Sequence, residues 1–278
     1  MRARMPHDIP ERLVRYEAAI EHAPETHAGS WLNDYGKGAT RLVVDLGCGK
    51  GQFLSALAPQ HPDCFFVGID QEDLCIAYAA QKAIEQGIPN VRYIISDANK
   101  LPEQFGEEEI SRLRINFPTP FPRAKHAPKR LTYFDRLLVY RKLLTRNGDI
   151  ILRTDSQPFF DFSLTQFEQA GFDIAELTRD LHATDPGLLS TEYEDRLSEA
   201  GARIHALRAT MAREPAAEQT AKRSLMDYLP DDLEHIEYVP YGMESAVVNF
   251  RNRRRKEARR AARAGKEDVN RNNPSANV

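Results

Sequence analysis

The chain has 278 residues, 41% of them hydrophobic, and a formal net charge of −3, which suits one domain of ordinary size with additions. No run of 18 apolar residues suggests a membrane span, and the first residues lack the apolar stretch of a secretory signal. The three cysteines (Cys48, Cys64 and Cys75) lack C-x-x-C spacing. We therefore expect no metal site, no disulfide framework and no membrane association, and a reducing cytoplasm fits best.

Short apolar runs alternate with helical patterns through most of the chain. Residues 1–39 are expected to form a peripheral helical segment, with an amphipathic helix in 9–22 and a loop after it. Strands are expected at 41–47, 64–70, 91–96, 113–117, 148–154, 172–177 and 202–209, with helices at 50–60, 72–87, 133–148 and 158–171 between them. This alternation predicts an α/β fold: a doubly wound, seven-stranded, mostly parallel sheet of the Rossmann-like kind, over residues 40–211.

The remaining residues form a C-terminal extension and a basic tail. Within the extension, 212–250, the sequence favours a helix at 218–230 and a strand at 245–250. Residues 251–278 carry ten Lys/Arg against three Asp/Glu and are expected to be disordered. The tail is either a solvated low-complexity segment or a binding site for a polyanion.

A glycine-rich turn follows the first expected strand. In "VVDLGCGKG", Asp45 precedes Gly47, Gly49 and Gly51. Glycines let a ligand approach backbone N–H groups at a helix start. The dinucleotide fingerprint is G-x-G-x-x-G, and an acid at this strand end would repel a pyrophosphate. An acid there suits a cationic ligand such as S-adenosylmethionine.

Two more acids end successive strands. Asp70 follows the second strand and suits ribose hydroxyls, and Asp97 follows the third and suits an adenine amino group. Ligands of open α/β sheets bind at the carboxyl ends of the strands. One such acid is often only a helix cap, but three with the glycines indicate a class I methyltransferase. The other expected cofactor-binding residues are Ala98, Asn116 and Thr119.

A rigid basic loop follows the fourth expected strand. Prolines at 118, 120, 122 and 128 exclude a helix or a central strand. The loop carries five basic or titratable side chains: Arg123, Lys125, His126, Lys129 and Arg130. Because the cations coincide with the prolines at a strand end, we interpret the loop as a stiff shelf that offers cations to phosphates rather than as a solvated face.

The loop and the cofactor motif together resemble the bacterial tRNA (guanine-N7)-methyltransferase family, over roughly residues 40–210. The family has Phe-Pro-Asp-Pro-Trp and then a basic run with one histidine; here residues 117–121 read "FPTPF". Its Thr-Asp after the fifth strand matches Thr154-Asp155, and its late Thr-x-x-Glu matches Thr191 and Glu194, which by itself would be a capping box. The resemblance implies S-adenosylmethionine as cofactor, tRNA as partner and a variable-loop guanine as target. It also implies contacts with guanine or tRNA at Arg123, Asp155 and Thr191 to Glu194, with Lys125 to Arg130 against the RNA.

Thr119 departs from the family, which has a carboxylate there. Guanine N7 carries no proton, so its methylation needs no general base and rests on positioning and electrostatics. We expect Thr119 and Asp155 at the catalytic centre. Two alternatives stay open: a methyltransferase of the same fold with another RNA or substrate, and a cofactor-binding tRNA-binding protein with little turnover. A monomer and a homodimer are both compatible with the sequence.

Overall fold

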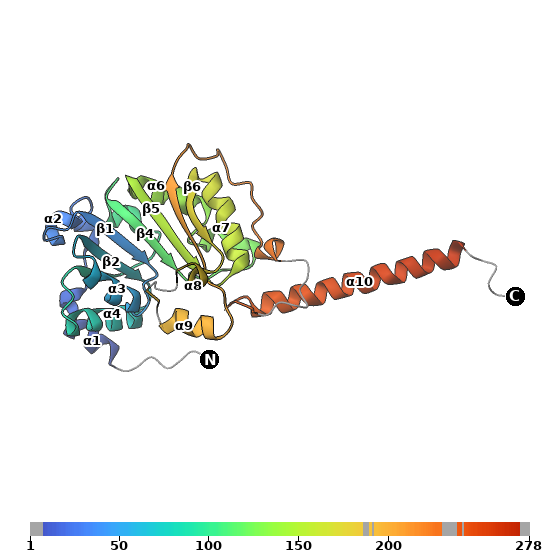
Figure 1. The fold of residues 1–278 in the computed structure, drawn as a ribbon, viewed down its shortest axis with the longest axis horizontal. Coiled ribbons are helices and arrows are strands. Elements are labelled where there is room, and N and C mark those ends of the chain that lie inside the picture. Colours follow the sequence, from blue (N-terminus) through green and yellow to red (C-terminus); the bar gives the residue numbers. More distant parts are fainter. Residues whose placement is uncertain (1–7, 186–188, 191, 230–237, 241, 273–278) are drawn as a thin grey trace.

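The computed structural model describes residues 8–185, 189–190, 192–229, 238–240 and 242–272. Its centre is one seven-stranded sheet (Figure 1). The strands are β1 (Arg41–Leu46), β2 (Cys64–Asp70), β3 (Val91–Ile95), β4 (Ile110–Asn116), β5 (Leu144–Thr154), β6 (Phe172–Thr178) and β7 (His205–Met211). All seven expected strands are therefore confirmed.

The order of the strands is β3-β2-β1-β4-β5-β7-β6. Strands β1 to β5 pair in parallel, whereas β7 runs antiparallel to both β5 and β6. This is the doubly wound, mostly parallel layout predicted from the sequence. Its consequence is that the carboxyl ends of β1 to β5 meet at one edge of the sheet.

Helices cover both faces of the sheet because successive strand residues point to opposite sides. The helices are α3 (Gln52–Leu57), α4 (Asp73–Glu85), α5 (Leu101–Gln104), α6 (Phe134–Leu143) and α7 (Gln157–Gln169). Leu42 and Val44 belong to the larger core, under α6 and α7, whereas Val43 belongs to the smaller one, under α3 and α4. Strand β5 begins at Leu144, four residues earlier than expected.

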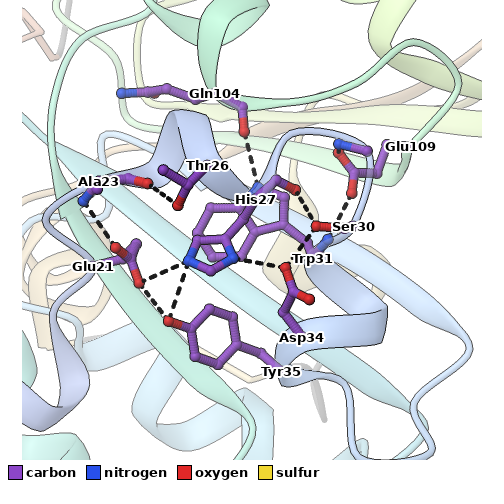
Figure 2. A network of polar contacts seen from close by, with 11 residues as sticks. Glu21, Ala23, Thr26, His27, Ser30, Trp31, Asp34, Tyr35, Gln104 and Glu109 are labelled. Atoms are coloured by element: carbon purple, nitrogen blue, oxygen red, sulfur yellow. Dashed lines mark hydrogen bonds and ion pairs between the residues drawn. The ribbon is translucent and has the colours of Figure 1, made fainter.

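The N-terminal segment contains α1 (Ile9–Arg15), two 3₁₀ turns (Glu17–Ala19 and Pro24–His27) and α2 (Trp31–Tyr35). The loop expected after residue 22 is instead tied by a polar network to α5 and to the residue before β4 (Figure 2). Trp31 is fully buried and donates from Nε1 to the carbonyl of Gln104 at 2.9 Å, while Glu109 accepts from the Trp31 backbone N–H. His27 lies between Asp34 (Nδ1–Oδ2, 2.7 Å) and Glu21 (Nε2–Oε2, 3.4 Å). This segment is therefore structural.

The C-terminal part differs most from expectation. The helix expected at 218–230 is only a 3₁₀ turn, η5 (Leu225–Tyr228), and the strand expected at 245–250 is the start of a helix. That helix, α10 (Glu244–Asn272), extends away from the body (Figure 1) through most of the tail that we expected to be disordered. The short helices α8 (Leu181–Thr184) and α9 (Glu192–Glu199) precede β7. In the described part of the chain, no helix is long and apolar enough to cross a membrane.

Candidate active site at the carboxyl edge of the sheet

The predicted acids lie at one edge of the sheet. Asp45 is the last residue but one of β1, Asp70 is the last residue of β2, and Asp97 follows β3 by two residues. Asn116 ends β4, between the strands that carry Asp45 and Arg153. Two cavities open at this edge and share the lining residues Gly47, Asn116 and Phe117.

The first cavity, called here the Asp45 cavity, has a volume of about 370 Å³. Asp45 is 1% exposed, and its Oδ1 accepts a hydrogen bond from Asn116 Nδ2 at 3.0 Å. Burial raises the pKa of Asp45 to about 6, although Arg114 and the Asn116 hydrogen bond oppose the rise. The Asn116 Oδ1 is buried and finds no partner among the described residues. A cationic N–H donor would satisfy both groups.

The second cavity, the Asp70 cavity, has a volume of about 620 Å³ and is also lined by Asp97, Ala98 and Thr119. The Asp70 carboxylate accepts from the backbone N–H groups of Gly49 and Glu72, each at 3.0 Å, so it ties the glycine turn to the end of β2. A carboxylate has about four acceptor sites, so hydroxyl donors can still bind. The Asp97 carboxylate accepts a hydrogen bond from the backbone N–H of Asn99 at 2.6 Å, which closes a turn after β3.

The glycines of the turn have two different roles. Gly47 and Gly49 have φ of +84° and +55°, line the Asp45 cavity, and would project a Cβ into open space. A side chain there would enter the cavity, so these positions keep room for a ligand. Gly51 lines neither cavity, and its contact with the cofactor stays a prediction. Its Cβ would lie 2.7 Å from Ala79 Cβ and 2.9 Å from Tyr93 Oη, so it permits the packing of α3 against α4.

The proline loop begins with strained backbone. Phe117 (φ +49°) and Phe121 (φ +44°) adopt the left-handed conformation on either side of the apex, which is unfavourable for aromatic residues. The Phe117 N–H donates to the Arg153 carbonyl at 2.8 Å. The Phe117 ring packs edge-on against the Tyr193 ring, with 5.3 Å between the ring centroids. Thr119 is thereby held at the exposed apex, where it lines the Asp70 cavity.

The basic side chains of the loop divide into two groups. Arg123, Lys125 and Lys129 are exposed, and His126 is partly exposed. Partial desolvation and the neighbouring lysines lower the pKa of His126. The exposure of these four residues leaves their predicted contact with RNA open, and that contact stays a prediction.

Arg130 does not share this exposure, and its predicted place against RNA is corrected. It is fully buried, and its guanidinium donates to the backbone carbonyls of Pro120 (3.0 Å), Phe121 (2.7 Å) and Arg223 (2.7 Å). It also lies 4.2 Å from the centroid of the Phe162 ring. Burial lowers the pKa of Arg130 to about 10. Its role is to join the proline loop to the C-terminal extension.

A buried ion pair, which the sequence did not predict, forms part of the wall of the Asp45 cavity and includes Glu194, the predicted guanine or tRNA contact. Arg153 Nη1 contacts Glu194 Oε2 at 3.3 Å, and both side chains are buried. Arg114 and Arg153 lie 5.1 and 5.3 Å from the centroid of the Phe53 ring. Burial raises the pKa of Glu194, an effect that Arg153 opposes. The signal available in the sequence was an arginine next to buried apolar residues in each of two strands, "LRINF" and "GDIILRT".

The C-terminal extension reaches the other predicted substrate residues. Asp155 accepts a hydrogen bond from Tyr238 Oη at 2.5 Å, and the neighbouring Ser156 Oγ donates to Met243 Sδ at 3.2 Å. Met243 is fully buried, so the extension is anchored beside Asp155. Thr191, the remaining predicted contact, lies outside the described residues.

A family model and related proteins match most of this chain. A family model described as "Putative methyltransferase" matches residues 39–207. The chain is 37% identical over 196 residues to a tRNA (guanine-N(7)-)-methyltransferase of Geobacillus thermodenitrificans, covering 70% of this chain and 90% of the relative. It is 35% identical over 210 residues to a tRNA (guanine-N(7)-)-methyltransferase of Streptococcus thermophilus, covering 75% of this chain and 98% of the relative.

Solved structures of other methyltransferases share the fold. The 16S rRNA methyltransferase KamB has a TM-score of 0.51 and 17% identity, with 66% of this chain and 93% of that chain covered. An antibiotic-related methyltransferase has a TM-score of 0.50 and 19% identity, with 64% of this chain and 90% of that chain covered. At such identities the likeness extends to the fold alone. By its sequence relatives, the chain belongs to the tRNA (guanine-N7)-methyltransferase family.

Proposed function

We propose that this protein transfers a methyl group from S-adenosylmethionine to N7 of a guanine in tRNA, with a variable-loop guanine as the target. The observation that carries the proposal is the junction of the Asp45 and Asp70 cavities directly beside the apex of the proline loop. A donor site and a cationic loop thus adjoin one another in a member of this family.

The lining residues match the chemical groups of the methyl donor. S-adenosylmethionine, when bound, supplies an activated methyl group on a sulfonium. The buried Asp45 carboxylate and the Asn116 Oδ1 suit the cationic methionine end, where Gly47 and Gly49 leave room. Asp70 retains acceptor sites for the ribose hydroxyls. Asp97 and Ala98 would face the adenine.

The residues on the guanine side would position the base and stabilise charge. Guanine N7 attacks with a lone pair and loses no proton, so the site requires no general base. Positive charge develops on the base during transfer, and a nearby carboxylate stabilises it. Asp155, which directly follows β5, would supply this carboxylate, and its Oδ2 accepts a hydrogen bond from Tyr238. Thr119 at the apex accepts a hydrogen bond without adding charge.

The exposed cations of the loop would bind the tRNA backbone. Arg123, Lys125 and Lys129 are exposed, and Lys129 lines the Asp70 cavity. Contacts of such cations with phosphates fix the register of an RNA without reading its sequence. A cytoplasmic location stays a prediction from the cysteines.

The test is mass spectrometry of nucleosides after incubation of an unmodified tRNA transcript with the protein and S-adenosylmethionine. We expect 7-methylguanosine with the wild type and its loss with Asp45→Asn. Asp63→Asn is the matched control, because Asp63 is an exposed aspartate at the opposite, amino end of β2. Cofactor binding by calorimetry without any methylated nucleoside would contradict the proposal and favour a tRNA-binding protein with little turnover.

A second candidate function is methylation of another RNA, and Thr119 is the observation that favours it. The same nucleoside assay, run on total RNA depleted of tRNA, distinguishes the two candidates. A modified nucleoside other than 7-methylguanosine, or one confined to the depleted fraction, would replace the first proposal with the second.

A further inference from the structure

A groove lies between the proline loop and the first turns of α10. Its volume is about 510 Å³, and three segments of the chain that are far apart in sequence build it. The lining residues are Pro122, Arg123, Ala124, Ser224, Met226, Gly242, Ser245, Ala246, Asn249, Phe250 and Arg253. We call it the α10 groove. The family model ends at residue 207, so most of this lining lies beyond it.

The walls of the α10 groove are firmly attached to the body. The Leu225 N–H donates to the Pro122 carbonyl at 3.1 Å, and Arg130 donates to the Arg223 carbonyl. Met243, directly before α10, and Val247, in its first turn, are at most 2% exposed. The groove is therefore a fixed feature rather than a chance gap beside a free helix.

The chemistry of the α10 groove fits a phosphodiester. Arg123 lies on one wall and Arg253 on the other, and neither Asp nor Glu occurs among the described lining residues. The Phe250 ring, with the Arg253 and Arg254 guanidinium groups 4.8 and 5.0 Å from its centroid, adds an aromatic surface. A guanidinium group can donate two parallel hydrogen bonds to the oxygens of one phosphate, which suits arginine to binding a polyanion.

A row of cations continues from the groove along α10. Ser245, Asn249 and Arg253 line the groove at helical spacing, and Lys256 and Arg260 follow on the same face, three and seven residues beyond Arg253. All three cations are exposed. They span roughly 10 Å at about 1.5 Å per residue. We call them the α10 stripe. The other exposed arginines of this stretch, Arg255 and Arg259, lie on a different face.

We infer that the α10 groove and the α10 stripe bind the sugar-phosphate backbone of the same tRNA whose guanine enters the site. The inference rests on the proposed function. Consecutive residues of one loop line both places: Thr119 and Phe121 face the Asp70 cavity, while Pro122 and Arg123 face the groove. An RNA strand leaving the active site along the loop therefore meets the groove next and then the stripe. The extension thus lengthens the RNA-binding surface in one direction.

The test compares two charge-matched variants of the full chain. Lys256→Ala with Arg260→Ala removes two cations of the stripe, and Arg255→Ala with Arg259→Ala removes two cations from the other face. Binding of fluorescent tRNA is measured by anisotropy over a series of salt concentrations. We expect the stripe variant to reduce the slope of log affinity against log salt by about two. The control variant should leave the slope unchanged.

A double-mutant cycle tests the groove itself. Arg123→Ala and Arg253→Ala should be non-additive in tRNA affinity, because both guanidinium groups face one phosphodiester segment. If the two substitutions change tRNA affinity strictly additively, the groove is not a binding site for one phosphodiester segment. If the stripe and control variants have equal salt slopes, α10 contributes only general electrostatic attraction and the α10 stripe is not a binding site. Either result with normal formation of 7-methylguanosine refutes this inference alone. Absence of 7-methylguanosine in the wild type refutes the proposed function.

Discussion

Arg130→Ala tests whether this residue holds the structure together or contacts RNA. The substitution leaves three backbone carbonyls without their donor and removes a guanidinium packed against Phe162. At about 1–2 kcal/mol for each of three carbonyls left without a donor, offset in part by the desolvation cost that the wild-type arginine bears, we expect a loss of about 2–4 kcal/mol in the free energy of unfolding. For a domain of this size the melting temperature should fall by roughly 4–16 °C.

The assay is thermal and urea unfolding, with Lys125→Ala as the control. Lys125 is an exposed cation of the same loop, so its removal should change stability by less than about 0.5 kcal/mol while reducing the salt slope of tRNA binding by about one. If Arg130→Ala keeps the wild-type stability and reduces the salt slope of tRNA binding by about one, the structural role is refuted and Arg130 contacts RNA instead.

Three further predictions concern the site itself. Because burial raises the pKa of Asp45 to about 6, S-adenosylmethionine affinity should fall about tenfold between pH 7 and pH 5 as the carboxyl is protonated. Calorimetry on Asp45→Asn should show weak binding without this dependence. The stability of the ligand-free protein depends on pH in the opposite direction to cofactor affinity. Asp45 contributes most to the free energy of unfolding below about pH 4, and that contribution is lost as pH rises through 6. Tyr238→Phe removes the hydrogen bond to Asp155 and should lower kcat/KM for tRNA roughly tenfold to a hundredfold, with unchanged cofactor affinity; an unchanged kcat/KM would leave the contact without a role in positioning. Thr119→Asp restores the family's carboxylate and should raise the methylation rate by at most about a hundredfold, whereas a lower rate on tRNA would indicate that the pocket is built for a different base or RNA.

The fold and the cofactor edge were determined by local sequence. Seven apolar runs alternate with helical patterns, and a parallel sheet brings the carboxyl ends of its strands together whatever the details of packing. Asp45, Asp70 and Asp97 could therefore be placed at one edge before any contact was known. The prolines likewise fixed a rigid loop after β4, because the pyrrolidine ring limits the backbone at each of them.

Tertiary structure decided which way individual side chains point. Arg123 and Arg130 look equivalent in a basic run, yet one is exposed and the other buried, because carbonyls from residues 120, 121 and 223 converge on the second. The Arg153–Glu194 ion pair joins residues 41 positions apart. The course of α10 depends on Met243 and Val247 packing into the core. Contacts between residues distant in the chain leave no periodic pattern in the sequence, so the buried ion pair and the α10 groove emerged only when the folded chain brought their parts together.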